Sequence, residues 1–142
     1  EDLLRSGFES LRGLLIDQQK DAFAKQQDID DRSLGFCLAM FEHAGGHIEL
    51  YRALVGGRGG VVALESIRRI LSDLVRDELT ASHGEEFVDA IPHELVIQYV
   101  VGAFMSVLTW WLDRDAKIPA EQIGAMFQRL THEGIFSGNL TD

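Results

Sequence analysis

The sequence predicts an all-α fold, a helical bundle of about six helices. Apolar residues recur at three- and four-residue steps along most of the chain, which is the repeat of one helix face. Only two prolines occur in 142 residues. Apolar residues make up 46% of the chain and the mean hydropathy is near zero, values typical of an ordinary folded domain. With no internal repeat and no linker stretch, residues 1–142 are predicted to form one domain.

The first predicted helix covers about twenty residues from the start of the chain. Its apolar residues form one stripe: Leu3, Leu4, Phe8, Leu11, Leu14, Leu15, Ala22 and Phe23. Asp28, Asp30 and Asp31 follow, and any of them can cap the next helix by accepting its free amide hydrogens. The second helix ends at Gly45-Gly46. Its apolar face consists of Leu34, Cys37, Leu38, Phe41 and Ala44.

Two predicted helices flank a glycine-rich break. A short third helix runs from His47 to about Val55 and ends at residues 56–60, Gly-Gly-Arg-Gly-Gly. We interpret these glycines as a hinge, because the phosphate-binding patterns GxxxxGK[ST] and GxGxxG are missing and no strand precedes them. Arg58 could still meet an anionic ligand or an acidic neighbour. The fourth helix runs from about Val61 to Leu79. Its inward residues are Leu64, Ile67, Ile70, Leu71, Leu74 and Val75.

The two prolines mark the starts of the last two helices. Residues 82–91 are predicted to form a loop, after which Pro92 and Pro119 each stand at a first helical position, where a missing amide hydrogen costs nothing. The fifth helix runs to about Asp113, and the sixth fades near Gly134. The apolar residues of the sixth helix are Ile123, Met126, Phe127 and Leu130.

The fifth helix contains no charged residue between Leu95 and Leu112. A helix that is apolar all round must be covered all round. A membrane span is one reading, but the run is at the short end of the ~20 residues that a bilayer needs. We therefore predict burial against the chain itself and against a second copy, with the last two helices forming a dimer four-helix bundle. The predicted interface residues are Gly102, Ser106, Thr109, Ile123, Phe127 and Leu130.

The charge balance excludes two classes of partner. Thirteen Lys and Arg against 23 Asp and Glu give a net charge of −10, which argues against this segment binding a phosphate backbone or an anionic membrane surface. The single Cys37 excludes an internal disulfide and a cysteine-only zinc site. It suits a reducing cytoplasm, and the acidic first residues differ from a signal peptide. We expect a cytoplasmic location.

Three patterns that could carry chemistry have simpler explanations. His43 and His47 have the i, i+4 spacing of metal ligands, but Gly45 and Gly46 between them are expected to break the helix. No glutamate follows the first histidine as a hydrolytic base would. Cys37 lies on an apolar face, so we expect a small buried side chain rather than a redox sensor. No Ser-His-Asp order is identifiable, and we predict neither an enzyme, nor a metal site, nor a cofactor.

A series of short segments carries a family resemblance. In order, they are Phe41–His43, Glu49–Leu54, the glycine break, Glu94–Val96 opening the apolar helix, Thr109–Leu112 closing it, Ile118–Gln122, and Met126-Phe127. Together they resemble the C-terminal ligand-binding and dimerisation domain of TetR-family bacterial transcriptional regulators. The resemblance covers nearly the whole chain. The family's N-terminal helix-turn-helix is absent from this sequence, so DNA contact is expected only through that missing part.

The resemblance implies a homodimeric regulator, expected to be a repressor, with a mostly apolar small effector held among the helices. The implied pocket residues are Phe36, Met40, His43 and Tyr51, facing Tyr99, Phe104 and Trp110 across the bundle. Each of these side chains could instead simply pack the core. Effector binding would move the first helix and so respace the DNA-reading heads. The alternatives are a helical protein–protein interaction module with no small ligand, or a small helical enzyme, which would need polar groups converging in a cleft.

Overall fold

The computed structural model describes residues 2–25, 35–56, 60–83, 87–88 and 91–131. Six helices lie in these ranges: α1 (Asp2–Lys25), α3 (Phe36–Gly46), α4 (Ile48–Gly56), α5 (Gly60–His83), α6 (His93–Asp113) and α7 (Ala120–Thr131). They confirm the predicted all-α class. Between α5 and α6, the two-residue strands β1 (Phe87–Val88) and β2 (Ile91–Pro92) pair antiparallel. This ribbon occupies the predicted loop and extends one residue past it, to Pro92. The loop also begins later than expected, because α5 continues to His83.

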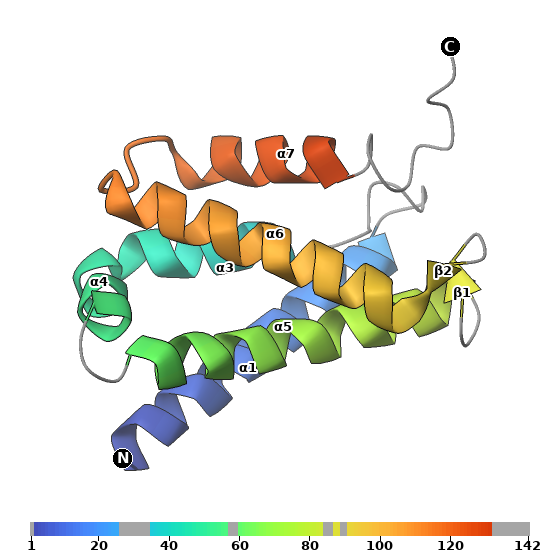
Figure 1. Ribbon diagram of the computed structural model, residues 1–142, viewed down its shortest axis with the longest axis horizontal. Coiled ribbons are helices and arrows are strands. Elements are labelled where there is room, and N and C mark those ends of the chain that lie inside the picture. The colour runs from blue at the N-terminus through green and yellow to red at the C-terminus, as the bar shows by residue number, and fades with distance from the viewer. Residues whose placement is uncertain (1, 26–34, 57–59, 84–86, 89–90, 132–142) are drawn as a thin grey trace.

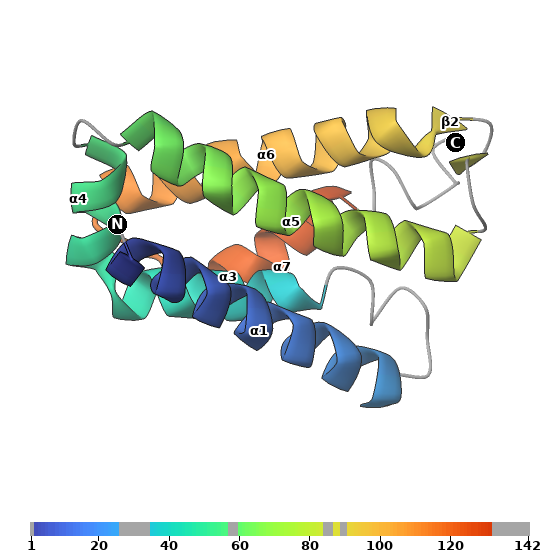
Figure 2. The same ribbon diagram turned by 90° about the horizontal axis from the view of Figure 1, so that it is seen from below.

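The helices stack so that α3 is enclosed (Figure 1). Figure 1 shows α7 above α6 and α3, with α5 and α1 on the opposite side. Contacts join α3 to both α1 and α7, while α5 packs along α6 and against α1. The short α4 closes one end of the bundle against the beginning of α5 (Figure 2). Because α3 has neighbours on both sides, most of its surface is apolar and buried.

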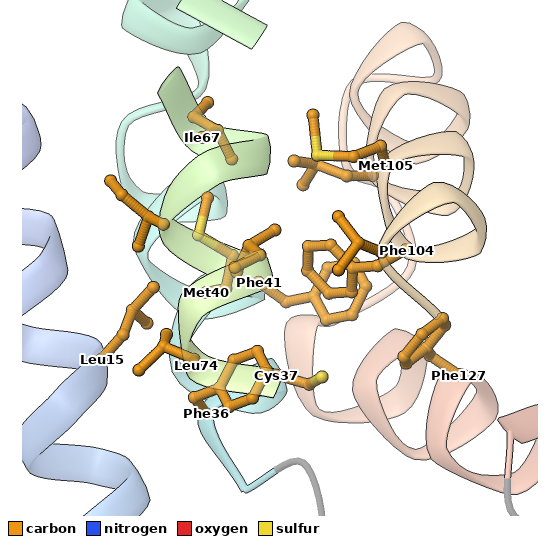
Figure 3. Packing of buried hydrophobic residues seen from close by; sticks show 14 of the residues in the cluster. Leu15, Phe36, Cys37, Met40, Phe41, Ile67, Leu74, Phe104, Met105 and Phe127 are labelled. Atoms are coloured by element: carbon orange, nitrogen blue, oxygen red, sulfur yellow. The ribbon is translucent and has the colours of Figure 1, made fainter. Parts of the chain in front are cut away.

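Aromatic rings from α3, α6 and α7 form the centre of the core (Figure 3). The ring of Phe41 lies 4.9 Å from that of Phe104 and 5.4 Å from that of Trp111, centroid to centroid. Phe104 meets Phe127 edge to face at 5.2 Å. Such tilted and edge-to-face pairs are the arrangements that aromatic quadrupoles favour. These rings therefore connect α3 and α7 through α6. The predicted inward residues of α5 are also confirmed, with Ile67, Ile70, Leu71, Leu74 and Val75 buried and Leu64 partly buried.

Two glycines stand where α3 meets its neighbours, and only Gly45 is tightly packed there. A Cβ atom on Gly124 of α7 would lie 3.6 Å from the Cα of Leu38 in α3, in ordinary contact. A Cβ atom on Gly45 of α3 would lie only 3.1 Å from the ring carbon Cη2 of Trp111. The last turn of α3 can therefore pack directly on the indole ring of Trp111.

The turn after α6 is a Schellman motif. The amide of Ala116 donates to the carbonyl of Trp111 at 2.9 Å, and the amide of Asp115 donates to the carbonyl of Leu112 at 3.0 Å. Asp115 and Ala116 have φ values of 59° and 50°, in the left-handed region that glycine adopts most easily. The indole Nε1–H of Trp111 donates to the carbonyl of Ile118 at 2.8 Å. This bond holds the far side of the turn against the core.

Both prolines precede their helices by one residue, rather than standing at the first helical position as predicted. Pro92 has φ −58° and ψ 139° and is the N-cap of α6. The carbonyl of Pro119 accepts hydrogen bonds from the amides of Gln122 and Ile123, so α7 begins at Ala120. A proline fits an N-cap because its fixed φ suits the extended entry to a helix.

Among the described residues, α6 is long and apolar enough to cross a membrane, with a mean hydropathy of 1.7 over 18 residues. Half of this 18-residue stretch is buried inside the fold. A buried helix in the core of a bundle meets the same criterion of length and composition.

Candidate effector-binding and dimerisation surfaces

The residues predicted to line a pocket divide into two groups. Phe36, Met40, Tyr51 and Phe104 are buried, and His43 is partly buried. The prediction that Tyr99 and Trp110 face inward across the bundle is wrong, because their exposed fractions are 61% and 44%. The opposite face of α6 packs against the rest of the chain. It consists of Val96, Ile97, Val100, Val101, Phe104, Met105, Leu108, Trp111 and Leu112.

The buried residues of this set do not all face the same side of α3. Figure 3 shows Phe36 toward Leu15 and Leu74, on the side of α1 and α5. Phe104 lies on the other side, where its ring contacts Phe41 and Phe127. The sequence-predicted set therefore combines two separate regions of the core.

A polar contact joins the end of α3 to α4. The Nδ1 of His43 and the hydroxyl of Tyr51 share a hydrogen bond of 2.8 Å. Burial raises the pKa of the Tyr51 hydroxyl well above its usual value. Burial lowers the pKa of His43, and the neighbouring His47 lowers it further. The geometry therefore favours a neutral imidazole bonded to a neutral phenol inside a largely apolar region.

The two histidines lie together despite the glycines between them. The helix α3 ends at Gly46, as predicted from these glycines, yet the imidazoles of His43 and His47 on either side still lie against one another. The rings of His43 and His47 stack with centroids 4.6 Å apart and planes at 26°. The Nδ1 of His47 bonds the carbonyl of His43 at 2.9 Å, and a carbonyl only accepts, so this nitrogen carries the proton.

This arrangement does not fit a shared metal ion. Both Nδ1 atoms are engaged, and the in-plane lone pairs of two stacked rings run side by side rather than converging on one point. In the part of the chain that the structure describes, no group of three or more His, Cys, Asp or Glu side chains could hold a metal. Cys37 is buried, as predicted. Burial, and secondarily the nearby Glu78, raise the pKa of its thiol, which makes it a poor nucleophile.

Two hollows lie on the α6 and α7 side of the fold. The first has a volume of about 480 Å³ and surrounds the turn after α6, with lining residues Trp110, Trp111, Asp113, Arg114, Asp115, Lys117 and Ile118. The guanidinium of Arg114 lies 4.3 Å from the centre of the Trp110 ring. Asp115 forms an ion pair with Arg52 of α4 at 2.6 Å.

The second hollow, here named the α6–α7 groove, has a volume of about 350 Å³ and is almost entirely apolar. It is lined by Ser106, Val107, Trp110, Ile123, Met126, Phe127 and Leu130. Of the residues predicted to line the effector pocket, Trp110 lines both hollows, and the other six line neither.

The predicted interface residues lie on or under one surface. Ser106 and Leu130 are exposed, and Gly102 and Thr109 are partly exposed. A Cβ atom on Gly102 would meet nothing within 4 Å, so this position opens outward. Ile123 and Phe127 differ from the expectation, because each is buried in the core of its own chain and forms the floor of the groove. The contact of Phe127 with Phe104 is the physical reason.

The structure also adds residues that the prediction missed. Leu95, Tyr99 and Met126 are exposed apolar side chains on α6 and α7. Leu95 and Tyr99, together with three predicted positions, form a line along α6, here named the outer stripe: Leu95, Tyr99, Gly102, Ser106 and Thr109. Its steps of 4, 3, 4 and 3 residues follow the seam of a coiled coil. That spacing was the sequence signal that could have found Leu95 and Tyr99.

A family model described as the C-terminal region of transcriptional regulators matches residues 31–133, which is more than half of the chain. The matched range contains all of α3 to α7. Neither a curated protein nor a solved structure matches the chain. The match confirms the family resemblance drawn from the short segments of the sequence.

Proposed function

Because the chain belongs to the TetR family of transcriptional regulators, as their C-terminal region, we propose that residues 1–142 form a single effector-sensing and dimerisation domain. The regulator is proposed to be a cytoplasmic repressor. Operator DNA would be read by a helix-turn-helix outside this sequence, which agrees with the net charge of −10. The family is one of transcription regulators rather than of enzymes.

The outer stripe and the adjoining groove are the observation that supports dimerisation. They place Leu95, Tyr99, Trp110, Met126 and Leu130 in water on one side of the molecule. Exposed apolar surface of this kind marks interaction sites. A second copy that packs its own α6 and α7 on this surface would complete a four-helix bundle. In a two-fold symmetric dimer the same surface of each copy meets itself. The outer stripe contains no charged residue, so two acidic copies can meet there without placing like charges against each other.

The proposed effector site lies at the junction of α3 and α4, beside the His43–Tyr51 hydrogen bond. A neutral imidazole and a phenol in apolar surroundings can hold one polar group of a small, otherwise apolar molecule. Met40 and Phe36 continue the apolar surface from this point along α3. Tyr99 and Trp110 are assigned to the dimer surface instead, because both are exposed there.

The proposed response to the effector is a population shift of α1. Among residues 7–21, the buried side chains of α1 are Leu11, Leu15 and Gln19, one on each turn. Phe8 and Ile16 are partly buried beside this line, and we propose that α1 can change its position while these contacts adjust. An effector that prefers one position of α1 shifts the equilibrium by no more than its difference in affinity for the two states.

Close packing favours a second candidate, a helical interaction module without a small ligand. Phe36, Met40 and Phe104 are almost fully buried, and neither described hollow reaches them. Native mass spectrometry of the purified chain, repeated after denaturation, separates the two functions. A small extra mass that denaturation releases supports effector sensing. If the chain carries no extra mass and a screen of apolar small molecules produces no thermal shift, the interaction module is the better account.

A further inference from the structure

Four charged side chains form a continuous line across three helices. Arg12 of α1 pairs with Asp73 of α5 at 2.9 Å, and Arg76 of α5 contacts the other oxygen of Asp73 at 3.3 Å. The Nε and Nη2 atoms of Arg76 donate to the two carboxylate oxygens of Glu94 in α6, each at 3.2 Å. These residues are named here the α1–α6 strap.

The chemistry of the strap makes its members depend on one another. Asp73 offers one oxygen to each arginine, so neither arginine displaces the other. Arg76 holds Glu94 through two parallel bonds, the geometry in which a guanidinium binds a carboxylate most strongly. Single pairs at this degree of exposure contribute little, whereas a chain of alternating charges orients every member at once. Arg12 and Glu94, at the two ends, are joined through Asp73 and Arg76.

The strap matters because polar contacts set much of the position of α1. Within residues 7–21, its apolar contact with the core consists of the buried Leu11 and Leu15 and the partly buried Phe8 and Ile16. Two turns after Arg12, the side-chain amide of Gln19 donates to the carbonyl of Leu74 at 2.9 Å and to Glu78 at 3.0 Å. Directional bonds to α5 thus stand beside Leu11, from Arg12, and one turn beyond Leu15, from Gln19. Such bonds specify the register of α1 on α5, which apolar contacts alone specify less strictly.

We propose that the strap couples the position of α1 to the first turn of α6, with Asp73 and Arg76 as positioning residues. Glu94 directly precedes Leu95, where the outer stripe begins, so a displacement at that end of the proposed dimer surface is passed to α1. The regulatory meaning of this coupling rests on the proposed function. The coupling itself is measurable without effector or DNA.

Amide hydrogen exchange of α1, over residues 7–21, tests the coupling in the 142-residue chain. Arg12→Gln is expected to raise exchange in α1 by about 2- to 5-fold. Glu94→Gln is expected to raise it by a similar factor of about 2 to 5, although the described partner of Glu94 is Arg76 of α5. In the double variant, Glu94→Gln adds nothing to the effect of Arg12→Gln on α1. The proposal is overturned if Glu94→Gln leaves α1 at its original rate, or if the two effects multiply.

Glu65 and Arg68 supply the matched control. They form a 3.9 Å pair within α5. Glu65→Gln and Arg68→Gln therefore remove the same kinds of charge from the helix that the strap crosses, and they should leave exchange in α1 unchanged. Amides of α7 serve as the internal reference. If Glu94→Gln quickens α7 as much as α1, the variant merely destabilises the fold and the proposal fails.

Salt provides a second measurement of the same coupling. In 1 M NaCl, where the Debye length is about 3 Å, the difference between the wild type and Glu94→Gln should shrink. A difference that persists unchanged in high salt would contradict an ionic strap. These exchange experiments are done without added effector. A negative result would therefore rule out the strap and leave the proposed effector-sensing function untouched. The absence of any effector would equally leave the strap intact.

Discussion

Phe41 and Trp111 meet edge to face, with ring centroids 5.4 Å apart and planes at 88°. This contact joins α3 to the last turn of α6, and it turns the neighbouring Trp110 outward. One step along a helix rotates the side chain by about 100°. Two consecutive tryptophans therefore lie on different faces of α6, with Trp111 1% exposed and Trp110 44% exposed.

The two tryptophans predict opposite outcomes for the same substitution. Trp111→Ala should lower the free energy of unfolding by about 3–5 kcal/mol, because it removes a buried ring and its hydrogen bond to Ile118. Trp110→Ala should leave monomer stability within about 1 kcal/mol, since it removes only an exposed ring and its contact with Arg114. It should instead weaken self-association. Urea unfolding at several protein concentrations measures both quantities, and equal losses of stability would contradict this division of α6.

His43 predicts a dependence of stability on pH. Its pKa in the folded chain is lowered from the usual 6.5 by burial and by His47, so the unfolded chain binds more protons below that value. The stabilisation is therefore fully present above pH 6.5 and is lost as the pH falls through the folded pKa. His43→Gln, which can still bond Tyr51, should make stability fall less steeply between pH 7 and pH 5.

The comparison must separate His43 from the carboxylates, which also titrate at low pH. Unfolding curves of the wild type and His43→Gln are therefore compared at each pH, so that the carboxylates common to both chains contribute equally to the two profiles. If the wild type and His43→Gln have parallel stability profiles, His43 does not titrate as the burial of its ring implies.

Ala116 predicts a stabilising substitution. Its φ of 50° is costly for a side chain with a Cβ, so Ala116→Gly should raise the free energy of unfolding by about 0.5 kcal/mol, net of lost packing and the greater freedom of glycine when unfolded. Ala53→Gly is the matched control. Ala53 is exposed in the helical α4, where glycine should cost about 0.5–1 kcal/mol. Thermal unfolding of both variants checks the sign, and a loss in both would contradict the left-handed turn.

The sequence predicted most helices because their apolar residues repeat with the helical period. The buried residues of α5 were predicted correctly from this repeat, because polar residues mark the opposite face of that helix. The helical repeat was less informative for α6. Because its central run has no charged residue, no charged face indicates whether Tyr99 and Trp110 point inward or outward. Which helices cover the ring of Phe36 depends on segments that are distant from α3 in the chain. The Arg12–Asp73 contact spans 61 positions, and no local pattern predicts such a pair.

Dimerisation through the outer stripe can be tested at Gly102. Leucine at this position has open space in the single chain and favours the helix, so it should not harm the fold. At a close crossing of two α6 helices it would overfill the contact, weakening association by about 10- to 100-fold. Gly13→Leu is the control, because Gly13 of α1 also opens into free space.

The measurement is the mass in solution by sedimentation equilibrium, on the wild type and both variants. We expect a wild-type mass of twice 15.8 kDa, the same mass for Gly13→Leu, and a shift toward the monomer for Gly102→Leu. A monomeric wild type would contradict dimerisation. A Gly102→Leu variant that stays as dimeric as the wild type would show that the outer stripe is not the contact surface.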